Sequence, residues 1–171
     1  MKKLVFVFTL ALFFNTNAQE KVNWISFEKA IELNKKKPKP IIIDIYTDWC
    51  GWCKKMDKET YTNSFIISYI NKNFYAIKLD GEGKEDITFR DHTFKYQKNG
   101  RRGFHELAAT LMNGKLSYPS TVFLNKNEGL IQNIPGYLKK EQLEKILVFF
   151  NTEIYKTKKW VDFEKDFKSN L

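Results

Sequence analysis

The chain has 171 residues, which is enough for one domain with its own hydrophobic core and too few for two comfortable ones. Its apolar share of 43% is ordinary for a globular protein, and its 15 phenylalanines predict an aromatic-rich interior. The net charge of +9 would suit nucleic acid, a membrane surface or an acidic partner, but the lysines are scattered, so we expect a solvated surface and no nucleic-acid partner.

The first 18 residues have the layout of a secretory signal peptide. Lys2 and Lys3 precede an apolar segment at 4–14, and small polar residues then lead to Ala18. The apolar segment is too short for a membrane-spanning helix, which needs about 20 residues. We therefore expect cleavage before Gln19, export to the periplasm, and one mature domain, 19–171, that does not span the membrane. Loss of the two lysines would leave 27 basic against 20 acidic residues, a net charge of +7.

A buried strand is predicted at 41–45. Ser26 is a plausible N-cap for a helix at 27–37, and prolines 38 and 40 end that helix before the strand begins. The strand is rich in isoleucine without polar alternation, which is typical of a strand buried on both faces. Asp44 is the one acid within it, and a buried carboxylate is costly unless it has a partner or a task.

This strand leads into Cys50-Gly51-Trp52-Cys53, which holds the only two cysteines of the chain, and then into a helical pattern that ends near residue 60. The free N–H groups and positive dipole end of a helix N-terminus favour a thiolate at Cys50, which we expect to be the more exposed of the two. A disulfide that closes so short a loop stabilises a fold very little. Zinc is disfavoured because neither histidine lies at ligand spacing, so we predict a redox-active pair and no metal.

Strand, helix and strand follow one another up to residue 80. Asn63 or Thr62 caps a predicted helix at 64–71, and a strand at 74–80 completes a βαβ unit whose strands should be parallel.

A long polar insertion, about 81–117, comes next. We predict a short helix at 87–96 and a second helix at 104–112, ended by Asn113-Gly114. Connections of this length tend to be functional or mobile.

The last part of the chain holds the remaining predicted elements. The tail, about 155–171, has Trp160, Phe163 and Phe167 on one helical face and is expected to dock on the domain. Before it, the pattern predicts a strand at 120–124, a hairpin partner at 130–134 and a helix that contains Leu143 and Phe150.

The segment Asp44-x5-Cys50-Gly51-Trp52-Cys53-Lys54, with Trp49 before the first cysteine, resembles the active-site segment of thioredoxin-fold thiol–disulfide oxidoreductases. The resemblance covers roughly 24–150 without the insertion. It implies an α/β thioredoxin-like fold, a central mixed β-sheet flanked by helices, with a helical insertion before the cis-proline strand.

The same resemblance implies roles for individual residues. Cys50 would attack a substrate disulfide, Cys53 would resolve the mixed disulfide, and Asp44, partnered by Lys78, would act as the base. Pro119 would be cis and would face the cysteines. The expected substrate-contact residues are Trp49, Gly51, Trp52, Tyr118, Pro119 and Ser120.

From this we expect an exported reductase of disulfides in other exported proteins, without a cofactor, monomeric, and kept reduced by a membrane thiol–disulfide relay. The buried acid and Lys78 favour the reductase, although Gly51-Trp52 differs from the Gly-Pro of thioredoxins. The alternatives are an oxidase or isomerase of the same fold and a non-catalytic binding module that uses the Trp/Pro119 groove. A copper carrier is the least favoured alternative, because the cysteine spacing and the two histidines do not suit copper binding.

Overall fold

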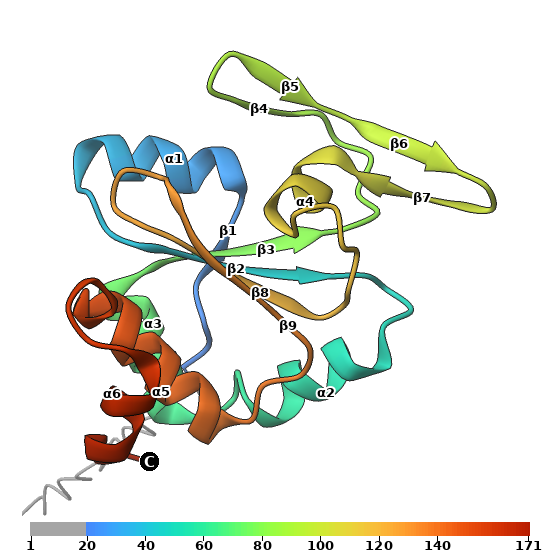
Figure 1. The fold of residues 1–171 in the computed structure, drawn as a ribbon. Coiled ribbons are helices and arrows are strands. Elements are labelled where there is room, and N and C mark those ends of the chain that lie inside the picture. The colour runs from blue at the N-terminus through green and yellow to red at the C-terminus, as the bar shows by residue number, and fades with distance from the viewer. Residues whose placement is uncertain (1–19) are drawn as a thin grey trace, which may run out of the picture.

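The computed structural model describes residues 20–171, in which a five-stranded mixed sheet has helices on both faces (Figure 1). The predicted signal peptide, residues 1–18, lies outside the described residues. The strand order is β1-β3-β2-β8-β9, with the first three strands parallel and the last two antiparallel to their neighbours. The predicted α/β class is confirmed. The strands are β1 (Trp24–Ile25), β2 (Ile41–Tyr46), β3 (Tyr75–Asp80), β8 (Ser120–Leu124) and β9 (Leu130–Pro135).

The helices divide between the two faces of the sheet, as Figure 1 shows. One face is covered by α1 (Phe27–Lys36) and α4 (Glu106–Leu111), and the other by α2 (Gly51–Glu59), α3 (Ser64–Asn73) and α5 (Lys140–Asn151). Side-chain caps fix where two of these helices begin. Ser26 Oγ accepts a hydrogen bond from Lys29 N at 3.2 Å at the start of α1, and Asn63 Oδ1 accepts one from Ile66 N at 3.1 Å at the start of α3. The N-cap of α3 is therefore Asn63, not Thr62.

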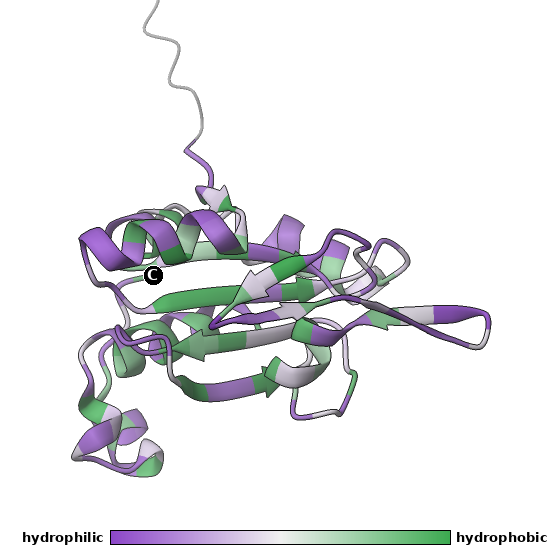
Figure 2. Ribbon diagram, turned by 90° about the horizontal axis from the view of Figure 1, so that it is seen from above, coloured by the Kyte–Doolittle hydropathy of each residue, from purple (hydrophilic) through white to green (hydrophobic). Residues whose placement is uncertain are grey.

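The alternation of side chains along β2 decides which of them face α2, the helix that begins directly after Cys50. Ile41, Ile43 and Ile45 belong to the apolar cluster under α1 and α4, whereas Ile42 belongs to the cluster under α3 and α5. Since successive side chains point to opposite faces, Asp44 shares the face of Ile42. In Figure 2 the central strands carry the hydrophobic colour between helices of mixed colour.

The predicted helix at 87–96 is wrong. This segment forms a β-hairpin from β4 (Ile87–Phe89) and β5 (His92–Phe94), closed by Arg90 and Asp91, both with positive φ (49° and 62°). Two such residues in a row are typical of the tight hairpin turn whose twist matches that of its strands. The apolar residues alternate with threonines, which suits a strand with one face on the core, where Ile87 is buried.

A second hairpin follows, and it too was missed by the sequence analysis. It pairs β6 (Tyr96–Asn99) with β7 (Arg102–His105), and Gly100 takes φ 61° in the turn between them. We call residues 96–105 the β6–β7 arm. It projects from the body of the protein and is largely hydrophilic (Figures 1 and 2). Of the two helices predicted in the insertion, only the second is present, as α4, and two hairpins precede it. The predicted helical insertion is therefore mostly β-hairpin.

The tail packs on the domain as predicted from its apolar face. After the 3-10 turn η1 (Ile154–Lys156), helix α6 (Trp160–Asp166) places two aromatic rings against Phe149 of α5. The ring centroids of Trp160 and Phe163 lie 5.2 and 5.0 Å from that of Phe149. None of the described helices is long and apolar enough to cross a membrane.

Candidate active site

The two cysteines lie at the junction of β2 and α2. Cys50 is the N-cap residue of α2, and its Sγ is bonded to Cys53 Sγ at 2.07 Å and accepts a hydrogen bond from Cys53 N at 3.1 Å. Both side chains are buried, with 4% exposure for Cys50 and 3% for Cys53, so the expected difference in exposure between them is very small. The neighbouring Trp49 and Trp52 are 51% and 59% exposed.

Asp44 is 2% exposed, and its Oδ2 lies 2.9 Å from Lys78 Nζ. Its Oδ1 has no hydrogen-bond partner among the described residues. Burial raises the pKa of Asp44 from 3.8 to about 6, against the opposing effect of the Lys78 charge. A carboxyl group with this pKa can gain or lose a proton near neutral pH, which is the property required of a general base.

Lys78 connects the sheet to the active-site helix. It lies beside Asp44 in the β2–β3 register, and its ammonium group contacts both Asp44 and Asp57 of α2. Burial lowers the pKa of Lys78, but its interactions with the two carboxylates outweigh burial and leave the pKa raised. The ammonium also lies over three aromatic rings, at 5.3 Å from the centroids of Trp24 and Tyr46 and 5.6 Å from that of Tyr61.

Asp57 is not among the predicted site residues, although the sequence holds a signal for it. Asp57 follows Cys53 by four residues, so both lie on one face of α2. Lys78 binds Asp57 and Asp44 together, which places the inward face of α2 over the buried acid.

The surroundings of Asp44 contain more polar atoms than an apolar interior usually tolerates. The hydroxyl groups of Tyr61 and Thr121 are buried without hydrogen-bond partners among the described residues, and Thr121 pairs with Asp44 across β2 and β8. Burial, together with the charge of Asp44, raises the pKa of Tyr61 well above its ordinary value. Tyr61 therefore stays protonated, and Asp44 is the member of this group that titrates near neutral pH.

The proline segment lies beside Trp49. The Tyr118–Pro119 peptide bond is cis, and Pro119 O accepts from Gly136 N at 2.8 Å. The rings of Trp49 and Tyr118 meet edge to face with centroids 5.9 Å apart. Trp49 and Tyr118, two of the predicted substrate-contact residues, thus form one surface, whereas Pro119 is buried.

The other predicted contact residues are arranged differently. Trp52 packs against Tyr137, with ring centroids 5.6 Å apart, and Gly51 stands where an added Cβ would meet nothing within 4 Å. Ser120 is fully buried, and its hydroxyl donates to Ser117 O at 2.8 Å, so its side chain does not reach the surface.

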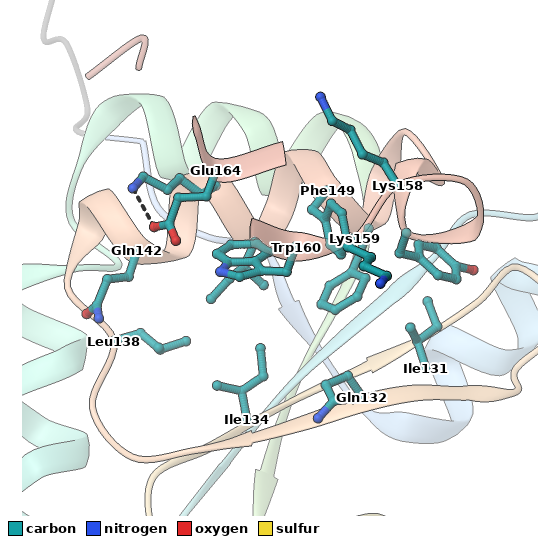
Figure 3. Close-up of a pocket in the computed structure, with 14 residues that line it drawn as sticks. Ile131, Gln132, Ile134, Leu138, Gln142, Phe149, Lys158, Lys159, Trp160 and Glu164 are labelled. Atoms are coloured by element: carbon teal, nitrogen blue, oxygen red, sulfur yellow. Dashed lines mark hydrogen bonds and ion pairs between the residues drawn. The ribbon is translucent and has the colours of Figure 1, made fainter. Parts of the chain in front are cut away.

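A cavity of about 740 Å³ lies between β9, α5 and the tail (Figure 3). Its walls are largely apolar, with Ile134, Leu138 and Trp160 turned toward one another. No predicted site residue lines it. A smaller cavity of about 330 Å³ is lined by Trp49, the residue before Cys50, and by Tyr118. Within residues 20–171, no cluster of three or more His, Cys, Asp or Glu residues is suited to a metal ion.

Comparisons with known proteins agree with this geometry. Residues 7–168 match the family model Thioredox_DsbH, described as "Protein of unknown function, DUF255". The chain is 30% identical over 128 residues to "Thiol-disulfide oxidoreductase ResA" of Bacillus thuringiensis subsp. konkukian, covering 70% of this chain and 68% of that protein. It is 29% identical over 89 residues to "Uncharacterized protein B0495.5" of Caenorhabditis elegans, covering 52% of this chain but only 12% of that much longer protein. A solved structure, "DsbH Oxidoreductase", shares the fold with a TM-score of 0.56 at 16% identity, over 79% of this chain and 88% of the other.

Proposed function

The chain belongs to the DsbH-type thioredoxin-like family, and on that premise we propose that it is an exported thiol–disulfide reductase that acts on disulfides of other exported proteins. The observation that carries the proposal is the Cys50–Cys53 pair at the first turn of α2, whose inward face lies over buried Asp44. A titratable acid behind a redox-active pair is the arrangement that a dithiol needs in order to lose its second proton.

Reduction of a substrate proceeds through two exchanges. The Cys50 thiolate attacks one sulfur of the substrate disulfide, which breaks that bond, releases the first substrate thiolate and leaves a mixed disulfide. The Cys53 thiolate then attacks Cys50 Sγ, which breaks the mixed disulfide and releases the second substrate thiolate. The two leaving thiolates take up protons, and the chain ends with the Cys50–Cys53 disulfide, so one disulfide forms for each one reduced.

Asp44 accepts the proton of Cys53 before the second exchange. Cys53 is 3% exposed, and burial disfavours its thiolate, so a base is required. Asp44 suits this role because burial holds its pKa near 6 and its Oδ1 has no partner among the described residues. Lys78 is a positioning residue, since it holds Asp44 on the sheet and Asp57 on α2.

Repeated turnover needs an outside donor of two electrons, for which we propose a membrane thiol–disulfide relay. The Trp49 and Tyr118 rings form the surface that an extended substrate segment would meet, next to the cis peptide bond of buried Pro119. The N-terminal segment, with its two lysines and apolar run, supports export. Fusion of that segment to a reporter that is active only outside the cytoplasm tests export, and an inactive reporter would refute it.

The direction of the reaction is tested by the reduction potential of the Cys50–Cys53 pair, measured by alkylation after equilibration with glutathione or dithiothreitol. We expect a value near or below about −250 mV, close to thioredoxin. A value above about −170 mV would overturn the reductase and identify an oxidase or isomerase. If Cys50→Ser left function in the cell intact, the chain would be a binding module instead.

A further inference from the structure

The β6–β7 arm brings positive charge to the edge of the active site. Lys98, Arg101 and Arg102 are exposed, and none of them forms an ion pair with a carboxylate of the described residues. The Arg102 guanidinium lies 4.3 Å from the ring centroid of Trp49, the residue that precedes Cys50. The arm therefore reaches the active-site surface through its basic side chain rather than through an apolar contact.

The base of the arm is fixed to the same edge. His105 N donates to Gly81 O at 2.7 Å, directly after β3, and the Tyr118 ring packs against Gly81 so closely that an added Cβ would collide with it. Gly103, next to Arg102, has no room for a Cβ either, because the Tyr96 ring fills that space. These close approaches fix the path of the backbone next to Arg102.

A cavity of about 330 Å³ opens between the arm and the proline segment. Trp49 and Arg102 line one part of it, and Leu116 and Tyr118 another. Glu82 supplies the one carboxylate among the described residues that line it. The cavity adjoins the surface that a substrate segment must cross to reach Cys50.

Stacking leaves the hydrogen-bonding groups of Arg102 available. A guanidinium that stacks on an aromatic ring uses its planar face, while its N–H donors point outward in that plane and match the two oxygens of a carboxylate. The Trp49 ring also holds the guanidinium in one orientation, which lowers the conformational entropy lost on binding. Lys98 and Arg101 add to the positive electrostatic potential around Arg102, and the negative charge of Glu82 opposes it.

We propose that this cavity receives an acidic side chain that lies next to the target cysteine, so that the chain selects disulfides flanked by Asp or Glu. Arg102 is then the specificity-determining residue, and Glu82 weakens the selection. This inference rests on the proposed function, because the selected segment is the substrate of the same cysteines.

The test is single-turnover reduction of three synthetic peptides by the protein after its disulfide has been reduced and the reductant removed. The peptides contain the same disulfide, flanked by glutamates, by glutamines or by lysines. At low ionic strength we expect the second-order rate constant for the glutamate peptide to exceed that for the glutamine peptide by about fivefold, with the lysine peptide slowest. Salt at about 0.5 M should reduce the difference, since it screens exposed charges.

Three variants separate selection from structure. Arg102→Glu should reverse the order of the peptides, and Glu82→Gln should increase the preference for the glutamate peptide. Arg90→Glu is the matched control, because Arg90 also lies over an aromatic ring, Phe89, at 4.9 Å but on the other hairpin. It changes the net charge by the same amount and should leave the ratio between peptides as it is.

The outcomes distinguish the inference from the function. Equal rates for all three peptides, or a ratio that changes as much in Arg90→Glu as in Arg102→Glu, would overturn the inference while the reductase stands. A glutamine peptide that reacts faster than the glutamate peptide would overturn the inference as well. If neither the peptides nor a small neutral disulfide were reduced, the proposed function would fail, and the inference with it.

Discussion

Replacement of Asp44 by asparagine should stabilise the oxidised protein at neutral pH while it slows the redox reaction. The side chain is 2% exposed, and burial raises its pKa from 3.8 to about 6. The folded chain therefore binds this proton more tightly than the unfolded chain, so the stability contributed by protonation is complete below about pH 4 and is lost as the pH rises through about 6. Asparagine has nearly the same shape and cannot ionise.

The size of the effect follows from the difference between the two pKa values, which is about 2. Each pH unit corresponds to about 1.4 kcal/mol, so ionisation of Asp44 costs about 3 kcal/mol of the free energy of unfolding at pH 7 and about 0.5 kcal/mol at pH 4. We expect Asp44→Asn to gain these amounts. Urea denaturation of both proteins, with the disulfide intact, across about pH 4 to 8 measures the difference.

The matched control is Asp57→Asn, which removes the other carboxylate bound to Lys78. The Asp57 side chain is 44% exposed, so its loss should change the free energy of unfolding by less than about 1 kcal/mol. A stability difference between wild type and Asp44→Asn that stays constant with pH would refute the assignment of a raised pKa to Asp44. A reaction rate that Asp44→Asn leaves unchanged would instead refute the role of Asp44 as the base for Cys53.

Three further changes test other parts of the site. Cys53→Ser should trap a mixed disulfide with substrate, visible by mass spectrometry, and the lack of an adduct would contradict the assigned order of attack. Gly81→Ala should destabilise the fold by about 1–3 kcal/mol in thermal or urea unfolding, because its Cβ would collide with the Tyr118 ring; an unchanged midpoint would refute that packing. Lys78→Met removes the charge that lowers the pKa of Asp44, so the pH–rate profile of reduction should move to higher pH, and a shift to lower pH would contradict the ion pair.

The sequence predicted the central sheet and its helices because their signals are local. The isoleucine run of β2, the cap at Ser26 and the Asn113-Gly114 stop each act within a few residues, and the structure has each of them. The Lys78–Asp44 pairing came instead from the resemblance, and the β2–β3 register places the two side by side. The segment from Asp44 to Cys53 combines a local strand–helix pattern with a resemblance to a known family, and together they predict the Lys78–Asp44 pair at the centre of the site.

The insertion was predicted less well because two of its signals compete. Residues 87–96 contain apolar side chains at spacings that fit a short helix, but they also alternate with threonines around Arg90-Asp91. Turn chemistry at that pair decides the outcome, and it produces a hairpin. In the next hairpin, Gly100 is the turn signal, and it takes φ 61° directly after β6. The contact of Arg102 with Trp49 joins residues far apart in the chain, so no local sequence pattern predicts it.

The topology explains why an insertion at this point bears on substrate choice. Strands β2 and β3 are parallel and end together, with Tyr46 opposite Asp80, and the cysteines follow the first of them. Strand β8 is antiparallel and begins at the same edge, with Ser120 opposite Ile45. A segment placed between β3 and β8 therefore leaves from and returns to the edge that holds the cysteines, whatever its internal structure. Its hairpins can change what surrounds Cys50 without altering β2, Asp44 or the first turn of α2, so the selection that we propose for the arm would leave the redox centre unchanged.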